Sequence, residues 1–66
     1  MITIKAIDIL KEDNKFTVRD IHNDETEGER YETYDVAYSE PQALTSANRR
    51  ASLLKVKSRG ITEIII

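Results

Sequence analysis

The closest approach to a metal-ligand pattern in the sequence is Asp20, His22 and Asp24, which alternate along one stretch. In an extended chain these side chains would project to the same side, where an imidazole and two carboxylates can bind a divalent cation. A lone histidine without a second nitrogen or sulfur ligand makes a poor site. We interpret the three residues as a charged rim where a strand ends, and we expect no metal and no other cofactor.

Patterns typical of catalysis are weaker still. The acidic segment 24–29 lacks the spacing of an EF-hand calcium loop and is interpreted as a solvated loop. No serine lies in a nucleophile elbow, and two glycines are too few for a phosphate-binding motif. Paired carboxylates occur only where burial cannot tune their pKa values. The sequence therefore predicts a protein that is not an enzyme.

The single helix of the chain is predicted between Ser39 and Gly60. Ser39 and Gln42 form a capping box, and Pro41 lies in the first turn, where its missing N–H matters least. Gly60 is expected immediately after the helix. The basic residues expected near the negative end of the helix dipole are Lys57 and Arg59.

One apolar stripe follows this helix at three- and four-residue spacing, formed by Leu44, Ala47, Ala51 and Leu54. Alanines on or beside the stripe, including Ala43, would let the helix lie close to a sheet.

The opposite face combines two aliphatic side chains with basic ones. Its members are Arg49, Arg50, Leu53, Val56 and Lys57. Aliphatic residues on a face that should be solvated indicate a contact surface, and these five are the candidate partner-binding residues. The alternative is that they are scattered exposed apolar residues on a solvated face, which are common.

Strands are predicted on both sides of the helix, over residues 1–10, 16–21, 31–38 and 61–66. In the first, the apolar alternation slips near Ala6 and Ile7, which predicts a bulge. Residues 11–15 are expected to form a hairpin turn and residues 22–30 an exposed, mobile loop. The order βββαβ predicts an α+β fold, with one helix packed on a mainly antiparallel sheet.

The third predicted strand contains the three tyrosines. Tyr34, Val36 and Tyr38 share one face, while Tyr31 lies on the other. We expect all three tyrosines to pack beside the helix, with an exposed Tyr31 at an interface as the alternative.

Length and charge set the remaining bounds. Sixty-six residues without cysteine form one domain, 1–66, whose small core leads us to expect self-association. No apolar run is long enough for a membrane span, and no signal-peptide pattern occurs, so we expect a cytoplasmic protein. Residues 1–40 carry a balance of −6 and residues 41–66 one of +4. The C-terminal third would therefore attract an anionic partner.

The leading hypothesis is a small non-catalytic protein that occupies a surface of another protein through the helix face or an exposed sheet edge. Small cysteine-free α+β proteins look like the inhibitors that bacteriophages and mobile elements encode against host or defence proteins, an analogy of scale and arrangement. An alternative is an oligomer that binds an anionic small molecule (a nucleotide) or nucleic acid. Its candidate ligand-binding residues are Ser46, Asn48, Arg49 and Arg50. The third hypothesis is a structural or assembly subunit.

Overall fold

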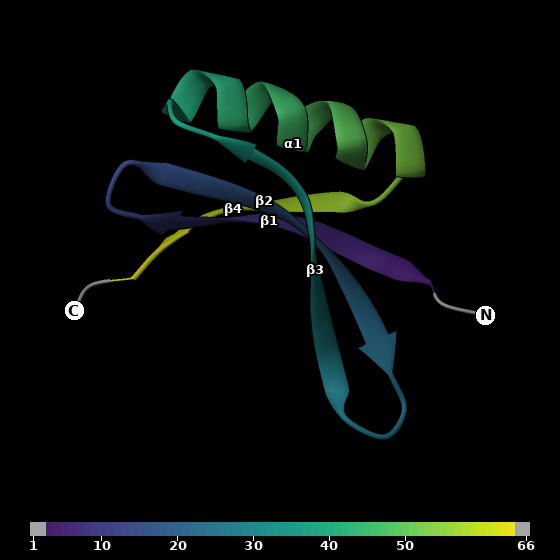
Figure 1. Cartoon of the computed structure of the whole chain (residues 1–66). Helices are drawn as coiled ribbons and strands as arrows, with labels where there is room; N and C mark the ends of the chain where they lie inside the picture. The colour runs from purple at the N-terminus through teal and green to yellow at the C-terminus, as the bar shows by residue number, and fades with distance from the viewer. Residues whose placement is uncertain (1–2, 65–66) are drawn as a thin grey trace.

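The computed structural model describes residues 3–64, which fold into four strands and one helix (Figure 1). In chain order the elements are β1 (Ile4–Glu12), β2 (Lys15–Asp24), β3 (Gly28–Ala37), α1 (Glu40–Leu54) and β4 (Lys57–Glu63). The predicted βββαβ order and α+β class are confirmed. The helix lies along one face of the sheet, whereas the far end of the β2–β3 hairpin projects away from it. No helix among the described residues is long and apolar enough to cross a membrane.

The strands form one mixed sheet in the order β3–β2–β1–β4. Strands β1 and β2 are antiparallel, as are β2 and β3, while β4 joins β1 in parallel. Strands β3 and β4 run in the same direction at opposite edges of the sheet, so a tight turn cannot connect them. Helix α1 supplies the crossover between them. Strands β3 and β4 are consequently the two outer strands.

The first hairpin turns at Asp13 and Asn14. Asp13 has a φ of 53°, a left-handed conformation that aspartate tolerates better than most residues. The predicted bulge in β1 is present, because the β1–β2 register shifts between Ile4 and Ala6. This shift allows both Ile4 and Ile7 to pack on the helix side of the sheet.

Residues 22–30 form the tip of a second hairpin, so the prediction that they form a loop is wrong, although most of them are exposed as expected. Strand β2 continues to Asp24, and β3 begins at Gly28 after a turn of three residues. Asp24 Oδ1 accepts hydrogen bonds from the backbone N–H groups of Thr26 at 2.8 Å and Glu27 at 3.3 Å. The Thr26 and Glu27 bonds lower the pKa of Asp24. Polar side chains concealed these strands because a hairpin end exposed on both faces needs no apolar alternation.

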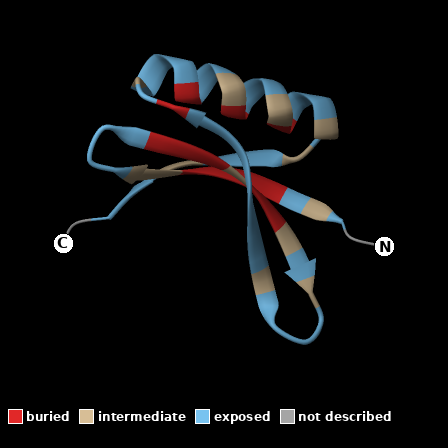
Figure 2. Cartoon of the chain, in the orientation of Figure 1, coloured by how far each residue is buried: buried red, intermediate tan, exposed pale blue. Residues whose placement is uncertain are grey.

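The core lies between α1 and the helix-facing side of the sheet (Figure 2). Its buried members are Ile7, Ile9, Phe16, Val18, Ala37, Ala43, Ala47 and Ala51. The buried alanines agree with the expected close approach of the helix. The predicted stripe is wrong at Leu44, which is 36% exposed. The helix instead turns Ala43 inward, since a methyl group allows the backbone to lie nearer the sheet than a leucine would.

The tyrosines do not join the core beside the helix as expected, although the Tyr34 ring lies against Arg50 of α1. Tyr31, Tyr34 and Tyr38 are all exposed, and Ala37 is the buried residue of β3. The β2–β3 register shifts opposite Val18 and Arg19, which changes the alternation along β3. Ala37 therefore lies in one buried cluster with the helix alanines Ala43, Ala47 and Ala51.

The helix ends earlier than predicted. Its last residue is Leu54, and Lys55 caps it in a left-handed conformation with φ 58° and ψ 43°. Gly60 lies within β4 rather than after the helix, as do Lys57 and Arg59. The chain must reverse at this point so that β4 can reach β1. The predicted strand 61–66 begins at Lys57, and residues 1–2 and 65–66 lie outside the described residues.

Candidate functional site

The five residues predicted to share one helix face do not lie together. Arg49 and Leu53 lie on the outer side of α1, where Leu53 is 73% exposed. Val56 follows the end of the helix and packs against the core, and Lys57 is the first residue of β4. Arg50 turns toward the sheet. The predicted face is wrong because the helix stops at Leu54 and its buried side is rotated toward Ala43.

Arg50 is bound within the fold by Asp20 of β2. Its Nε donates to Asp20 Oδ1 at 3.2 Å and its Nη2 to Oδ2 at 2.9 Å. This bidentate bond to a carboxylate that is only 6% exposed raises the pKa of Arg50. The Arg50 guanidinium also lies over the Tyr34 ring, with 4.4 Å between Cζ and the ring centroid. Arg50 therefore joins α1, β2 and β3.

An equivalent group lies on the opposite face of the sheet. Arg19 donates from Nε and Nη2 to the two carboxylate oxygens of Asp8, at 2.8 and 2.5 Å. The Asp8 hydrogen bonds raise the pKa of Arg19, and its guanidinium carbon lies 4.2 Å from the Tyr31 centroid. Tyr31 and Tyr34 are thus held at the surface by arginines whose carboxylate partners are buried.

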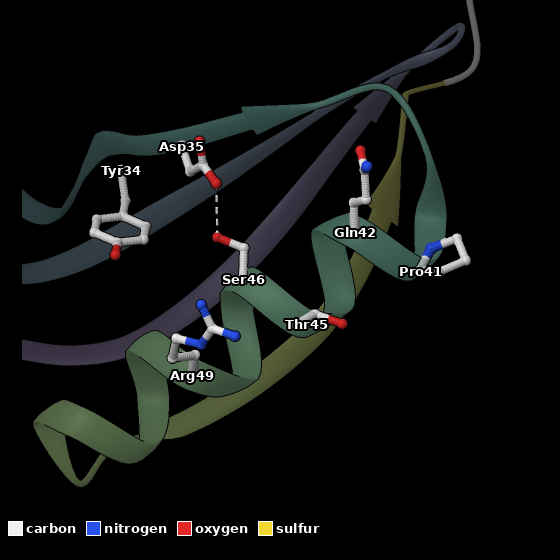
Figure 3. A pocket seen from close by; sticks show the side chains of 7 residues that line it. All are labelled: Tyr34, Asp35, Pro41, Gln42, Thr45, Ser46 and Arg49. Atoms are coloured by element: carbon white, nitrogen blue, oxygen red, sulfur yellow. Dashed lines mark hydrogen bonds between the residues drawn. The ribbon is translucent and has the colours of Figure 1, made fainter.

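A hollow of about 390 Å³ lies between β3 and the N-terminal half of α1 (Figure 3). Its lining residues are Tyr34, Asp35, Pro41, Gln42, Thr45, Ser46 and Arg49. Asp35 points across the hollow and accepts a 2.8 Å hydrogen bond from Ser46 Oγ, while the Arg49 guanidinium extends from α1 into the same space. The other Asp35 oxygen accepts from the backbone N–H of Val36 at 2.9 Å.

A second, more open hollow of about 800 Å³ continues along the outer side of the helix. It is lined by Thr45, Asn48, Arg49, Ser52 and Leu53. The two hollows are adjacent, because Thr45 and Arg49 line both, and we refer to them together as the α1 groove. It contains all but one of the candidate ligand-binding residues, the exception being Arg50.

Arg49 is the unpaired arginine of the groove. Among residues 3–64, the other arginines each lie within 4.0 Å of a carboxylate oxygen: Arg19, Arg30, Arg50 and Arg59. Arg49 has no such partner among these residues and lies beside exposed Leu53. A free guanidinium next to an aliphatic side chain can bind a carboxylate and an apolar group together.

The three candidate metal ligands take different partners. Asp20 binds Arg50, and Asp24 caps the turn of the second hairpin. His22 Nε2 lies 3.3 Å from Glu32 Oε2 without a well-aligned hydrogen bond. Within the described part of the chain, no group of three or more potential ligands is arranged to hold a metal ion.

Six groove residues were not predicted as site residues from the sequence: Tyr34, Asp35, Pro41, Gln42, Thr45 and Ser52. The available signal was the spacing of the alanines, because a buried side centred on Ala47 directs Thr45 and Arg49 outward. The contribution of β3 had no such signal, since it depends on which strand lies beside the helix.

Comparison of this chain with protein-family models, curated proteins and solved structures finds no significant match. The case for a function therefore depends on the groove and its neighbouring residues.

Proposed function

We propose that this protein is a non-catalytic binding protein that occupies a surface of a partner protein through the α1 groove. The observation that carries this proposal is Leu53, 73% exposed and adjacent to the unpaired Arg49. Burying a leucine side chain in a contact is worth roughly 1.5–3 kcal/mol. A single exposed leucine is ordinary, but one that lines a groove with a free arginine is a suitable anchor.

Arg49 is a better anchor than Arg50 for an electrostatic reason. A partner carboxylate that approached Arg50 would have to compete with Asp20, which already binds it through two hydrogen bonds. Arg49 gives up no ion pair with another described residue, so a carboxylate bound there adds an interaction. The partner surface that fits the outer hollow, which Asp35 does not line, therefore carries an acidic residue beside an apolar one.

The proposed mode of action is steric. A protein that covers a partner's surface needs no reactive group of its own, and the rigid attachment of α1 to the sheet would present Arg49 and Leu53 in a fixed geometry. Blocking another protein in this way is how a small inhibitor of the phage type would act.

Photocrosslinking at position 53 tests the proposal. In one variant Leu53 is replaced by benzoylphenylalanine, in cells that naturally make the protein. In a separate control variant the same residue replaces Asn14, in the exposed first turn. We expect a discrete adduct with one protein from position 53 that disappears when Arg49→Glu is added. Equal adducts from both positions, or an adduct that persists in Arg49→Glu, would refute the proposal.

Native mass spectrometry of the purified protein separates this proposal from the ligand-binding hypothesis. A species without added mass is expected from a protein-binding surface. An oligomer that retains a small anionic molecule would instead favour binding through Ser46, Asn48 and Arg49. The Asp35 carboxylate in the same groove weighs against an anion near Ser46, because like charges repel.

A further inference from the structure

Strand β3 has an open outer edge. It is ten residues long and pairs with β2 on one side, while no described strand pairs with its other side. Alternate backbone N–H and C=O groups of a strand point to each side, so β3 presents a row of groups that another strand can bind. Proteins commonly protect such edges with charged side chains, and β3 carries Glu29, Arg30 and Glu32, so a second strand can pair here only in a register that opposes unlike charges.

The first half of β3 is also accessible. Residues 28–33 belong to the part of the hairpin that projects away from α1 (Figure 1). The register shift that interrupts the regular pairing lies beyond Thr33. A second strand can therefore approach this segment without meeting the helix.

Among axes placed at residues 29–32, the charges of this segment favour one self-pairing register. In an antiparallel pair, directly opposed residues lie on the same face of the sheet. A two-fold axis that relates two copies of β3 must therefore lie between the two copies of one residue, which are directly opposed. An axis at Arg30 opposes two arginines, and an axis at Glu29 or Glu32 opposes two glutamates. An axis at Tyr31 instead places Arg30 of each copy opposite Glu32 of the other.

Both members of this pair are available for it. The side chain of Arg30 is 63% exposed and that of Glu32 74% exposed. Their contacts within the chain are long, 3.6 Å from Arg30 to Asp24 and 3.3 Å from His22 to Glu32. The same axis brings together the two Tyr31 rings, each 49% exposed and already held by Arg19.

We propose that the partner of the β3 edge is a second copy of this chain, paired antiparallel about a two-fold axis at Tyr31. The two sheets join into one, and two Arg30–Glu32 pairs flank the axis. Because the axis is perpendicular to the sheet, both helices lie on the same face, and none of the residues 28–33 lines the α1 groove. The pairing is therefore independent of the function proposed for the groove.

Sedimentation of charge variants tests this pairing. The wild-type protein is expected to form a reversible dimer with a dissociation constant between about 10 µM and about 1 mM, as for a weak interface of small area. Arg30→Glu and Glu32→Arg should each weaken the dimer about tenfold or more, because each variant opposes like charges twice. Arg49→Glu makes the same charge change as Arg30→Glu in the groove and should leave the dimer unchanged.

A mixture of the two variants tests whether residue 30 of one copy pairs with residue 32 of the other. Arg30→Glu contains two acidic residues where Glu32→Arg contains two basic ones, so the mixture should form a heterodimer more tightly than either variant forms its own dimer. The double variant Arg30→Glu/Glu32→Arg should recover the wild-type dimer. A wild-type protein that stays monomeric at about 1 mM would overturn the proposal. So would a dimer indifferent to these changes, or one abolished by Leu53→Asp instead.

Discussion

Glu29 of β3 and Arg59 of β4 are joined by two hydrogen bonds, although their strands are the two outer strands of the sheet. Arg59 Nη1 donates to Glu29 Oε1 at 3.3 Å, and Nη2 donates to Oε2 at 3.0 Å. Lys5 Nζ lies 2.6 Å from the same Oε2. The strong twist of the sheet brings these edges toward each other over the face that α1 leaves uncovered.

A small second apolar cluster lies on this uncovered face. Ala6 and Ile21 are paired across β1 and β2, and they are 3% and 0% exposed although α1 packs on the other side. Tyr31 is the neighbour of Ile21 on β3, and its hydroxyl donates to Glu29 at 3.0 Å. Long polar side chains thus cover a position where a larger protein would place a second layer.

Glu29→Gln should remove stability that depends on pH. Arg59, followed by Lys5 and Tyr31, lowers the pKa of Glu29 from 4.5 to about 2. Because the folded-state pKa lies below the unfolded one, the stabilisation is fully present above about pH 4.5 and is lost as the pH falls toward 2. We expect Glu29→Gln to lower the unfolding temperature at pH 7 and to match the wild type near pH 2.

Glu25→Gln, in the turn of the same hairpin, is the matched control and should change the unfolding temperature little at any pH. Thermal unfolding followed by circular dichroism across this range provides the measurement. If the difference in unfolding temperature between Glu29→Gln and the wild type did not change with pH, the ion pairs of Glu29 would not stabilise the fold.

Arg50→Ala and Arg49→Ala should differ strongly although the two residues are neighbours in the sequence. Removal of Arg50 leaves the buried Asp20 carboxylate without its two hydrogen bonds, and we expect a loss of about 2 kcal/mol in the free energy of unfolding. Partial exposure of the guanidinium keeps the loss below that of a fully buried pair. Arg49→Ala removes no ion pair with a described residue and should change stability by less than about 0.5 kcal/mol. Urea unfolding of both variants measures the contrast, and equal losses would contradict the assigned helix orientation.

Ala47→Leu tests how closely α1 lies against the sheet. Ala47 is fully buried, and the extra side-chain volume should destabilise the protein by about 1–3 kcal/mol. Thr45→Leu adds a leucine on the exposed outer side of the same helix and should cost far less. The two unfolding midpoints in urea provide the comparison. A harmless Ala47→Leu would mean that the helix can move away from the sheet.

The start of α1 could be predicted from the sequence because local chemistry determines it. Ser39 accepts a hydrogen bond from the backbone N–H of Gln42 at 3.4 Å, and Pro41 lies in the first turn, as expected. The helix end could not be predicted in this way. Lys55 adopts a left-handed conformation for which glycine is the usual signal, and Gly60 supplied a misleading one five residues later.

The site was predicted only in part, for a related reason. Arg49 and Arg50 are the same residue type, and the orientation of the helix about its axis determines which of them binds a carboxylate. The sequence pattern placed Leu44 rather than Ala43 on the buried side, because leucine is the more apolar residue. Ala43 instead belongs to the buried cluster that includes Ala37 of β3, and such packing between distant segments leaves no local pattern.

Lys55→Gly should stabilise the protein. Lys55 has φ 58° and ψ 43°, a conformation that costs a residue with a Cβ atom roughly 1 kcal/mol. Glycine relieves this strain but has more freedom in the unfolded chain, so we expect a net gain of about 0.5 kcal/mol. Lys55→Ala is the matched control, because it removes the long side chain and keeps the Cβ atom, and it should give no gain. Urea midpoints measured at constant m-value distinguish the two variants. If Lys55→Gly were less stable than Lys55→Ala, backbone strain could not be what sets the end of α1.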